Sequence, residues 1–316
     1  MKVLHIIAIS CLVAGLLLGV IALALGDFDM YLFDINKYIE GSETLSGDFT
    51  HIKTDTVEGD IRFLPSKDDT CRVEYRCREK MSYRIAIEGD TLVIETEDHR
   101  KWYDHISFFS FRGCQVTVYL PESHYTSLSV DTTTGDVEVP KDFTFDTVTI
   151  EGTTSDIHYA APTSGDVSIT VTTGNVKVSR CTLHQLTVKA STGDIFLDHV
   201  NSSTISLKNT TGEMQIDNCV AGSLSIHGST TDVEMEDTRA INEMNISVST
   251  GDVEFERCDA GSMTINTTTG DVEGSLLSPK IFVCKTTTGE VHVPGTTTGG
   301  ICKITCTTGD IEITIN

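Results

Sequence analysis

A short turn motif recurs through the C-terminal part of the chain at an almost constant interval. Its centre is a glycine followed by an acidic residue or asparagine, usually after threonine or serine. Successive copies lie 19 or 20 residues apart when two degenerate copies, Ser155-Asp156 and Thr231-Asp232, are included. A fixed period of this length indicates a repeat architecture. The predicted structural turn glycines are Gly135, Gly174, Gly193, Gly212, Gly251, Gly270, Gly289 and Gly309.

Apolar and polar residues alternate on both sides of each turn, as in Val253 and Phe255 after Gly251. A period of two predicts strands. One repeat buries only about four apolar side chains, worth ~1.5–3 kcal/mol each. Ordering its backbone costs ~1–2 kcal/mol per residue. The repeats must therefore stack on one another to share a core.

We predict an all-β fold: a β-solenoid (β-helix-like) of 19–20-residue two-strand coils, with neighbouring coils ~4.8 Å apart. Glycine supplies the positive φ of each corner, and the acid after it can cap backbone amides as an Asx-type turn does. If the coils follow sequence order, Ile265 points inward between Ile246 and Cys284. Two antiparallel sheets of successive hairpins are the alternative.

The chain is expected to have three parts. Residues 1–26 are a transmembrane anchor or signal peptide, 27–125 a β-rich N-terminal capping region, and 126–316 the β-solenoid repeat domain. The aromatic residues of the capping region should plug the end of the core, or else form an exposed contact for a partner or membrane. These are Trp102, Phe108, Phe109 and Phe111.

The N-terminal segment 3–25 carries no formal charge and is long enough to span a bilayer as a helix. Lys2 precedes it and Asp27 and Asp29 follow it, which predicts a cytoplasmic N-terminus and an extracytoplasmic C-terminal domain. We therefore expect a single-pass protein of the cell membrane, held there by its N-terminal helix. Cleavage as a signal peptide is the alternative.

The net charge of −23 argues against nucleic acid as a partner, because binding phosphates requires lysine and arginine. An envelope glycan or a protein partner is compatible with it. The stacked threonine pairs of the turns, such as Thr268-Thr269, could bind a glycan along one flank.

Stacking should also align the corner acids, and clustered carboxylates can bind Ca²⁺. Asp232, Asp252 and Asp271 are the candidate metal ladder. The nonapeptide pattern of Ca²⁺-binding β-rolls is absent, so turn capping is the favoured role for these acids. We expect no metal and no cofactor.

An outward position two residues after each corner acid is where a β-helix enzyme would carry its acids and bases. No nucleophile elbow, zinc-binding or phosphate-binding motif occurs in the chain, so we predict that it is not an enzyme. The column reads Glu138, His158, Lys177, Phe196, Gln215, Glu234, Glu254, Glu273, His292 and Glu312.

Equivalent positions two coils apart are ~9.6 Å apart, too far for a disulfide. Cys181, Cys219 and Cys258 occupy such positions, and Cys284 has no cysteine beside it in the predicted stack. We therefore predict that these four are reduced. A pair within the capping region is left open for Cys71, Cys77 and Cys114.

The order of these segments resembles the bacterial "putative adhesin" family of β-strand repeat domains, whose role is unassigned. The resemblance rests on SGDFTHIKTDTVEGDIRFLP, CRVEYRCREKMSYRIAIEGDTLVIETED and the serial TTGDVEV units, covering about residues 45–316. It implies a cell-envelope repeat protein, often tethered to a membrane, and supplies no catalytic residues. We predict a non-catalytic, adhesin-like scaffold or binding surface. The alternatives are a membrane-tethered envelope-stress sensor or regulator, and a polysaccharide-active β-helix enzyme.

Overall fold

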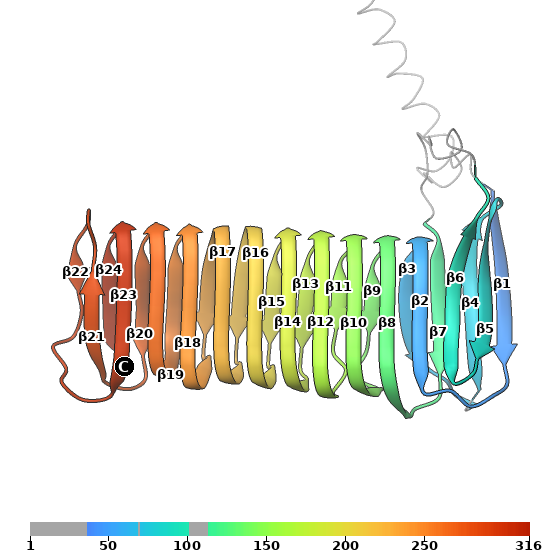
Figure 1. The fold of residues 1–316 in the computed structure, drawn as a ribbon, viewed down its shortest axis with the longest axis horizontal. Helices are drawn as coiled ribbons and strands as arrows, with labels where there is room; N and C mark the ends of the chain where they lie inside the picture. Colours follow the sequence, from blue (N-terminus) through green and yellow to red (C-terminus); the bar gives the residue numbers. More distant parts are fainter. Residues whose placement is uncertain (1–36, 69, 101–112) are drawn as a thin grey trace, which may run out of the picture.

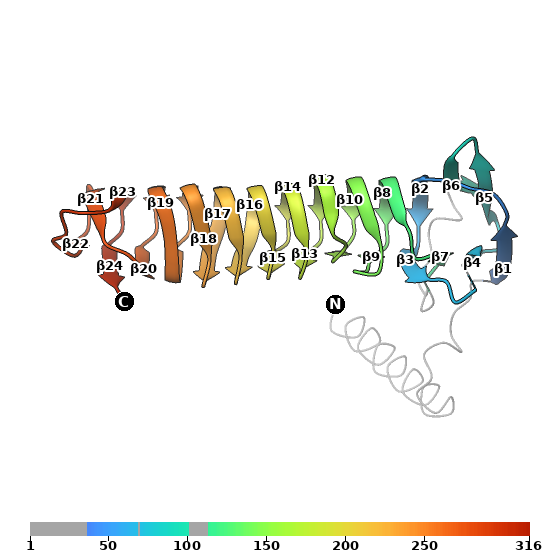
Figure 2. The ribbon, with the colours of Figure 1, turned by 90° about the horizontal axis from the view of Figure 1, so that it is seen from below.

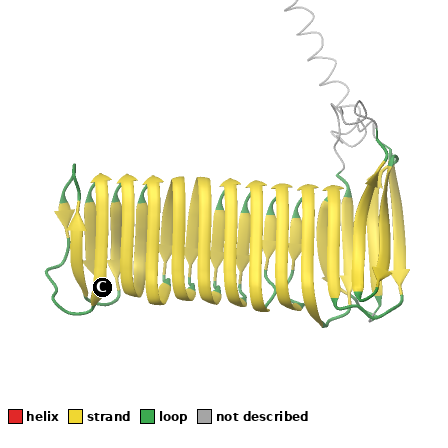
Figure 3. Ribbon diagram, viewed as in Figure 1, coloured by secondary structure: helices red, strands yellow, loops and turns green. Residues whose placement is uncertain are grey.

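A computed structural model describes residues 37–68, 70–100 and 113–316, which form a stack of strands along one axis (Figure 1). The predicted anchor of residues 1–26 and the aromatic residues of segment 101–112 lie outside the described residues. All regular structure in the described part is β (Figure 3). That part contains no helix long and apolar enough to cross a membrane.

An antiparallel cap covers the N-terminal end of the stack (Figure 2). Within it β1 pairs with β4, β4 with β7, and β5 with β6. The strands are β1 (Tyr38–Leu45), β4 (Cys71–Arg78), β5 (Met81–Glu88), β6 (Thr91–Asp98) and β7 (Gln115–Leu120).

The solenoid begins earlier in the chain than residue 126. Strands β2 (His51–Glu58) and β3 (Asp60–Pro65) already pair in parallel with the first regular coil. Thr54 lies opposite Val130, and both are buried. Much of the cap therefore consists of the described residues between 66 and 123, which form an excursion between two stacked coils.

The coils pair in parallel, which makes the antiparallel alternative wrong for this part of the chain. The described part contains a β-solenoid of about nine turns. Its strands up to residue 276 are β8 (His124–Thr134), β9 (Val137–Val139), β10 (Thr144–Thr154), β11 (Ile157–Tyr159), β12 (Thr163–Thr173), β13 (Val176–Ser179), β14 (Thr182–Thr192), β15 (Ile195–Asp198), β16 (Asn201–Asp217), β17 (Val220–Glu236), β18 (Arg239–Thr250), β19 (Val253–Thr269) and β20 (Val272–Leu276).

The interior of the solenoid is a stack of apolar side chains in strict register. One column places a branched aliphatic residue from each coil directly on the next, and every member is buried. Its successive members are Val130, Ile150, Ile169, Val188, Leu207, Ile226, Ile246, Ile265 and Ile304.

The last two coils do not follow sequence order, which corrects the predicted neighbours of Ile265. Ile265 lies opposite Ile246 and Ile304, and Cys284 lies beyond Ile304. The inserted coil consists of β23 (Gly300–Thr308) and β24 (Ile311–Ile315), and the terminal coil of β21 (Lys280–Lys285) and β22 (Val291–His292).

The two coils differ in burial. A coil inside the stack is covered on both sides, whereas the terminal coil has a neighbour on one side only. The inserted coil carries five inward residues that are at most 3% exposed: Cys302, Ile304, Cys306, Ile311 and Ile313. The terminal coil leaves Phe282, Cys284 and Val293 only partly buried.

A second corner of the coil uses left-handed backbone without glycine. Five residues at equivalent positions have φ between 48° and 54°. They are Arg180, His199, Asn218, Asp237 and Arg257. Most carry a cost for this conformation that glycine avoids, and no sequence motif marks the corner.

Candidate functional site

The turn glycines occupy the tightest positions of the stack. All eight have φ between 129° and 147°, a region that side chains disfavour. Each also lies against backbone of the neighbouring coil: a Cβ on Gly270 would sit 2.0 Å from the carbonyl oxygen of Gly251. Glycine is therefore needed for the spacing of the coils as well as for the turn.

The corner acids form a chain of hydrogen bonds that runs from coil to coil. Asp252 Oδ1 accepts from the backbone N–H of Asp271 at 2.7 Å, and Asp271 Oδ1 accepts from that of Asp310, also at 2.7 Å. The acids thus serve the amide of the next coil rather than that of their own turn. The donors along the series are Asp136, Asp156, Asn175, Asp194, Glu213, Asp252, Asp271, Asp310 and Glu290.

The series also shows why aspartate and asparagine dominate these positions. Their side-chain oxygen is at the right distance to accept from the backbone amide of the next coil. Asn175 can therefore take the place of an aspartate: its Oδ1 accepts from the backbone N–H of Asp194 at 2.8 Å. In the part of the chain that the structure describes, the series is interrupted between Glu213 and Asp232. The longer glutamate side chain does not continue it.

This bonding predicts the effect of changing Asp252. Asp252→Ala leaves the amide of Asp271 without its acceptor and should lower the free energy of unfolding by about 1–3 kcal/mol. Asp252→Asn keeps the acceptor and should change stability by less than about 0.5 kcal/mol. Guanidinium titrations of both variants provide the measurement, and equal losses would contradict a hydrogen-bonding role.

Among the described residues, no group of three or more histidine, cysteine, aspartate or glutamate side chains could hold a metal ion. In the predicted metal ladder, Asp232, Asp252 and Asp271 each engage one carboxylate oxygen with a backbone amide. The corner acids therefore act as hydrogen-bond acceptors that join neighbouring coils.

The threonines of the turns form a regular row along one flank of the solenoid. The second threonine of each turn lies in register with those of the adjacent coils, and these residues are exposed. The row runs through Thr154, Thr173, Thr192, Thr211, Thr230, Thr250, Thr269 and Thr308.

The outward column predicted from sequence exists, with a changed order at its end. Because the inserted coil lies beside β20, Glu312 stands next to Glu273, and His292 follows it. Four glutamates of successive coils are thereby stacked, and we call them the glutamate column: Glu234, Glu254, Glu273 and Glu312. All four are exposed.

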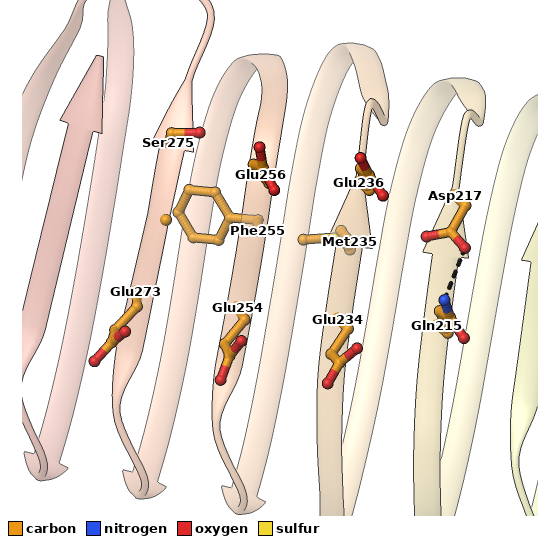
Figure 4. A pocket seen from close by; sticks show the side chains of 11 residues that line it. Gln215, Asp217, Glu234, Met235, Glu236, Glu254, Phe255, Glu256, Glu273 and Ser275 are labelled. Atoms are coloured by element: carbon orange, nitrogen blue, oxygen red, sulfur yellow. Dashed lines mark hydrogen bonds between the residues drawn. The ribbon is translucent and has the colours of Figure 1, made fainter. Parts of the chain in front are cut away.

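A second acidic column, which the sequence analysis missed, runs beside the first. It consists of Asp198, Asp217, Glu236 and Glu256 in register. The alternating pattern alone could have indicated it, since these residues lie two positions further along the same strands. The two columns line an open groove, in which Glu234, Glu254 and Glu273 project on one side and Asp217, Glu236 and Glu256 on the other (Figure 4).

The two columns differ in how their charge is balanced. Arg257 forms ion pairs with Glu236, Asp237 and Glu256 next to the second column. In the described part of the chain, no lysine, arginine or histidine forms an ion pair with the glutamate column. Its carboxylates repel one another at ~4.8 Å spacing.

Desolvation in the groove, together with the neighbouring Glu234 and Glu273, holds the pKa of Glu254 above its usual value. The folded state therefore binds this proton more tightly than the unfolded chain does. Ionised Glu254 destabilises the fold at neutral pH, and that cost disappears as pH falls below its unfolded pKa.

We accordingly expect Glu254→Gln to raise the free energy of unfolding by about 0.2–1 kcal/mol at neutral pH. The gain should shrink to zero near pH 4, where the glutamate is itself protonated. Paired denaturant titrations across this pH range give the measurement. A gain that is independent of pH would mean that charge repulsion is not its source.

The cysteines of the described part are buried apolar fillers, except Cys284, which is only partly buried. None of the nine cysteines in the described ranges forms a disulfide. Burial raises the pKa of Cys181 and Cys219 to about 12 and that of Cys258 to about 11, so their thiols stay protonated and unreactive. Val200 and Thr238 lie between these cysteines along the stack.

These features define a class: an all-β solenoid repeat protein with a filled interior, a capped N-terminal end and a repeated acidic outer face. The chain belongs to the Toastrack DUF4097 family, whose model matches residues 49–226 and 177–316. This match confirms the resemblance drawn from the sequence.

Similar solved structures include several bacterial proteins. Two are described as putative adhesins: one from Parabacteroides distasonis (13% identity, TM-score 0.44, 88% of this chain and 98% of that one) and one from Parabacteroides merdae (13%, 0.42, 89% and 98%). A third, from Parabacteroides distasonis, is described as a putative lipid binding protein (15%, 0.39, 87% and 96%). No curated protein matches the chain.

Proposed function

We propose that this protein is a non-catalytic scaffold of the bacterial cell envelope whose outer face binds an extended envelope polymer. The glutamate column is the observation that carries the proposal. Four stacked carboxylates that form no ion pair with any described residue make a linear, periodic site, and such a site suits a polymer that carries amino groups at intervals. The exposed threonine row on the same coils offers hydroxyl groups along the flank.

The groove along the glutamate column contains several carboxylates, which are also the groups that a polysaccharide-active enzyme would need. General acid–base catalysis needs two groups whose environments push their pKa values apart. Glu234, Glu254 and Glu273 instead occupy equivalent positions on successive coils, with similar surroundings. The arrangement therefore favours multivalent binding over catalysis.

The experiment measures binding of the full chain, solubilised in detergent, to isolated cell-wall material at low and high salt. The test variant Glu234→Gln/Glu254→Gln/Glu273→Gln should weaken binding roughly tenfold, the loss of about 1.4 kcal/mol. High salt should weaken binding of the unmodified chain as well.

A matched control lies on the opposite sheet, where Asp55, Asp131 and Glu151 are also stacked in register. Their conversion to Asn, Asn and Gln removes the same charge and should leave binding unchanged. Equal losses in both variants, or no saturable binding, would reject the proposed site. Release of soluble sugars that depends on Glu254 would support the enzyme instead.

We also infer that residues 3–25 hold the protein in the cell membrane with its repeat domain outside the cytoplasm. The support is the length and charge pattern of that segment. Protease added to intact cells should then remove a C-terminal tag without lysis. Protection of the tag until lysis would place the domain on the inner side.

A further inference from the structure

Lys280 is a buried lysine in the terminal coil, only 3% exposed, where side chains otherwise face an apolar core. Its Nζ donates to the carbonyl oxygen of Ala260 at 2.7 Å and to Ser278 Oγ at 2.8 Å. It also forms an ion pair with Asp259 Oδ1 at 2.5 Å. All three donor positions of the ammonium group are thus occupied.

These contacts reach across an entire coil. Lys280 of β21 lies opposite Gly300 of β23, and Gly300 in turn lies against Gly261, the residue after Ala260 in β19. Ser278, two residues before Lys280, lies directly beside Asp259 and donates to its Oδ1 at 3.0 Å. The path is open because the inserted coil has no side chain there: Lys280 lies opposite Gly300, and Gly299 precedes it. A Cβ on Gly299 would meet the carbonyl oxygen of Pro279 at 1.8 Å, and one on Gly300 that of Gly261 at 1.8 Å.

The repeats themselves permit a second order of the last two coils. Both carry the same corner, Thr-Thr-Gly-Glu-Val in the terminal coil and Thr-Thr-Gly-Asp-Ile in the inserted one. In the order that follows the sequence, β21 would lie directly on β19, only ~4.8 Å away. The long lysine side chain fits a partner two coils away, at ~9.6 Å, and would be crowded at half that spacing.

We propose that Lys280 and Asp259 form a latch that selects the order of the final two coils. A buried ion pair adds little stability compared with apolar packing, but it discriminates strongly against arrangements that leave either charge unpaired. The latch thereby decides which coil forms the open end of the rod. We call the order seen in the structure, with β23 between β19 and β21, the latched order. In the latched order this end carries the exposed aliphatic residues Ile281, Val283 and Val291.

Engineered cysteine pairs on the outer face distinguish the two orders in the full chain. Thr264 and Val283 both lie opposite Lys303, on its two sides. Thr264→Cys with Lys303→Cys should crosslink in the latched order, at a Cα spacing of ~4.8 Å. Thr264→Cys with Val283→Cys should crosslink only in the sequence order, because two coils separate them in the latched one.

With Lys280 intact, we expect only the Thr264–Lys303 pair to crosslink under mild oxidation, as identified by peptide mass. Lys280→Met, which keeps the length of the side chain, should raise the yield of the Thr264–Val283 crosslink at least tenfold. Asp259→Asn should act in the same direction. Lys285→Met, an exposed lysine of the same strand, is the matched control and should change neither yield.

The latch is rejected if Lys280→Met and Asp259→Asn both fold and crosslink only the Thr264–Lys303 pair. It is equally rejected if Lys280→Met fails to fold while Asp259→Asn folds in the latched order alone. In either case the order of the coils would come from apolar burial and the loop, without the ion pair.

Discussion

Replacing Ile265 by aspartate is expected to lower the free energy of unfolding by more than about 4 kcal/mol. Ile265 is fully buried and lies between Ile246 and Ile304 in the aliphatic column. The neighbours of Ile265 in this column are aliphatic, so none of them can pair with a new carboxylate. The charge would either stay unpaired or separate two adjacent coils.

Thr264→Asp is the control, since Thr264 is the preceding residue on the same strand and its side chain faces outward. This change should cost less than about 1 kcal/mol. Guanidinium titrations of the two variants give the comparison. Similar losses for both would contradict the inward and outward assignment of β19, and with it the register of the stack.

Gly270→Ala is expected to cost about 3–5 kcal/mol, from two additive causes. The backbone at Gly270 has a φ of 137°, where a side chain is strained. The new methyl group would also lie 2.0 Å from the carbonyl oxygen of Gly251, which is backbone and cannot move without shifting its coil. Relief would require opening the stack on that side.

Gly295→Ala provides the matched control, because a Cβ at that position would meet nothing within 4 Å. Its effect on the unfolding midpoint should be close to zero. If the two alanine variants unfolded at the same denaturant concentration, the corner glycines would have no part in setting the coil spacing.

Much of the solenoid follows from local features of the sequence. The alternation around Gly251 and Gly270 fixes which residues face inward, because successive side chains of a strand point to opposite faces. The period of 19–20 residues fixes the length of a coil. Glycine can be recognised at eight of the corners because the backbone there has a positive φ that other residues disfavour.

The function of the corner acids was only partly predictable. Their role as caps follows from their place after glycine, but the amide that they cap belongs to the next coil. Asp252 and Asp271 illustrate this, since the acceptor and the donor are 19 residues apart. Local turn chemistry contains no information about a partner at that distance.

The candidate site depended even more on the tertiary structure. Sequence order placed Glu312 beyond His292, whereas the insertion of β24 beside β20 brings Glu312 next to Glu273. The glutamate column therefore contains four adjacent residues instead of the three expected from sequence order. The second acidic column had a visible alternation, but only the register showed that Glu236 and Glu256 share the groove.

The sequence by itself determined the coil, its inward residues and its glycine corners, because these depend on strand geometry and on glycine. Only the tertiary structure decided which coils are neighbours. Near-identical repeats carry near-identical local signals, so their order depends on long-range packing. β2 joins β8 across the cap, and β23 enters between β19 and β21, and each of these pairings joins residues that are far apart in the sequence.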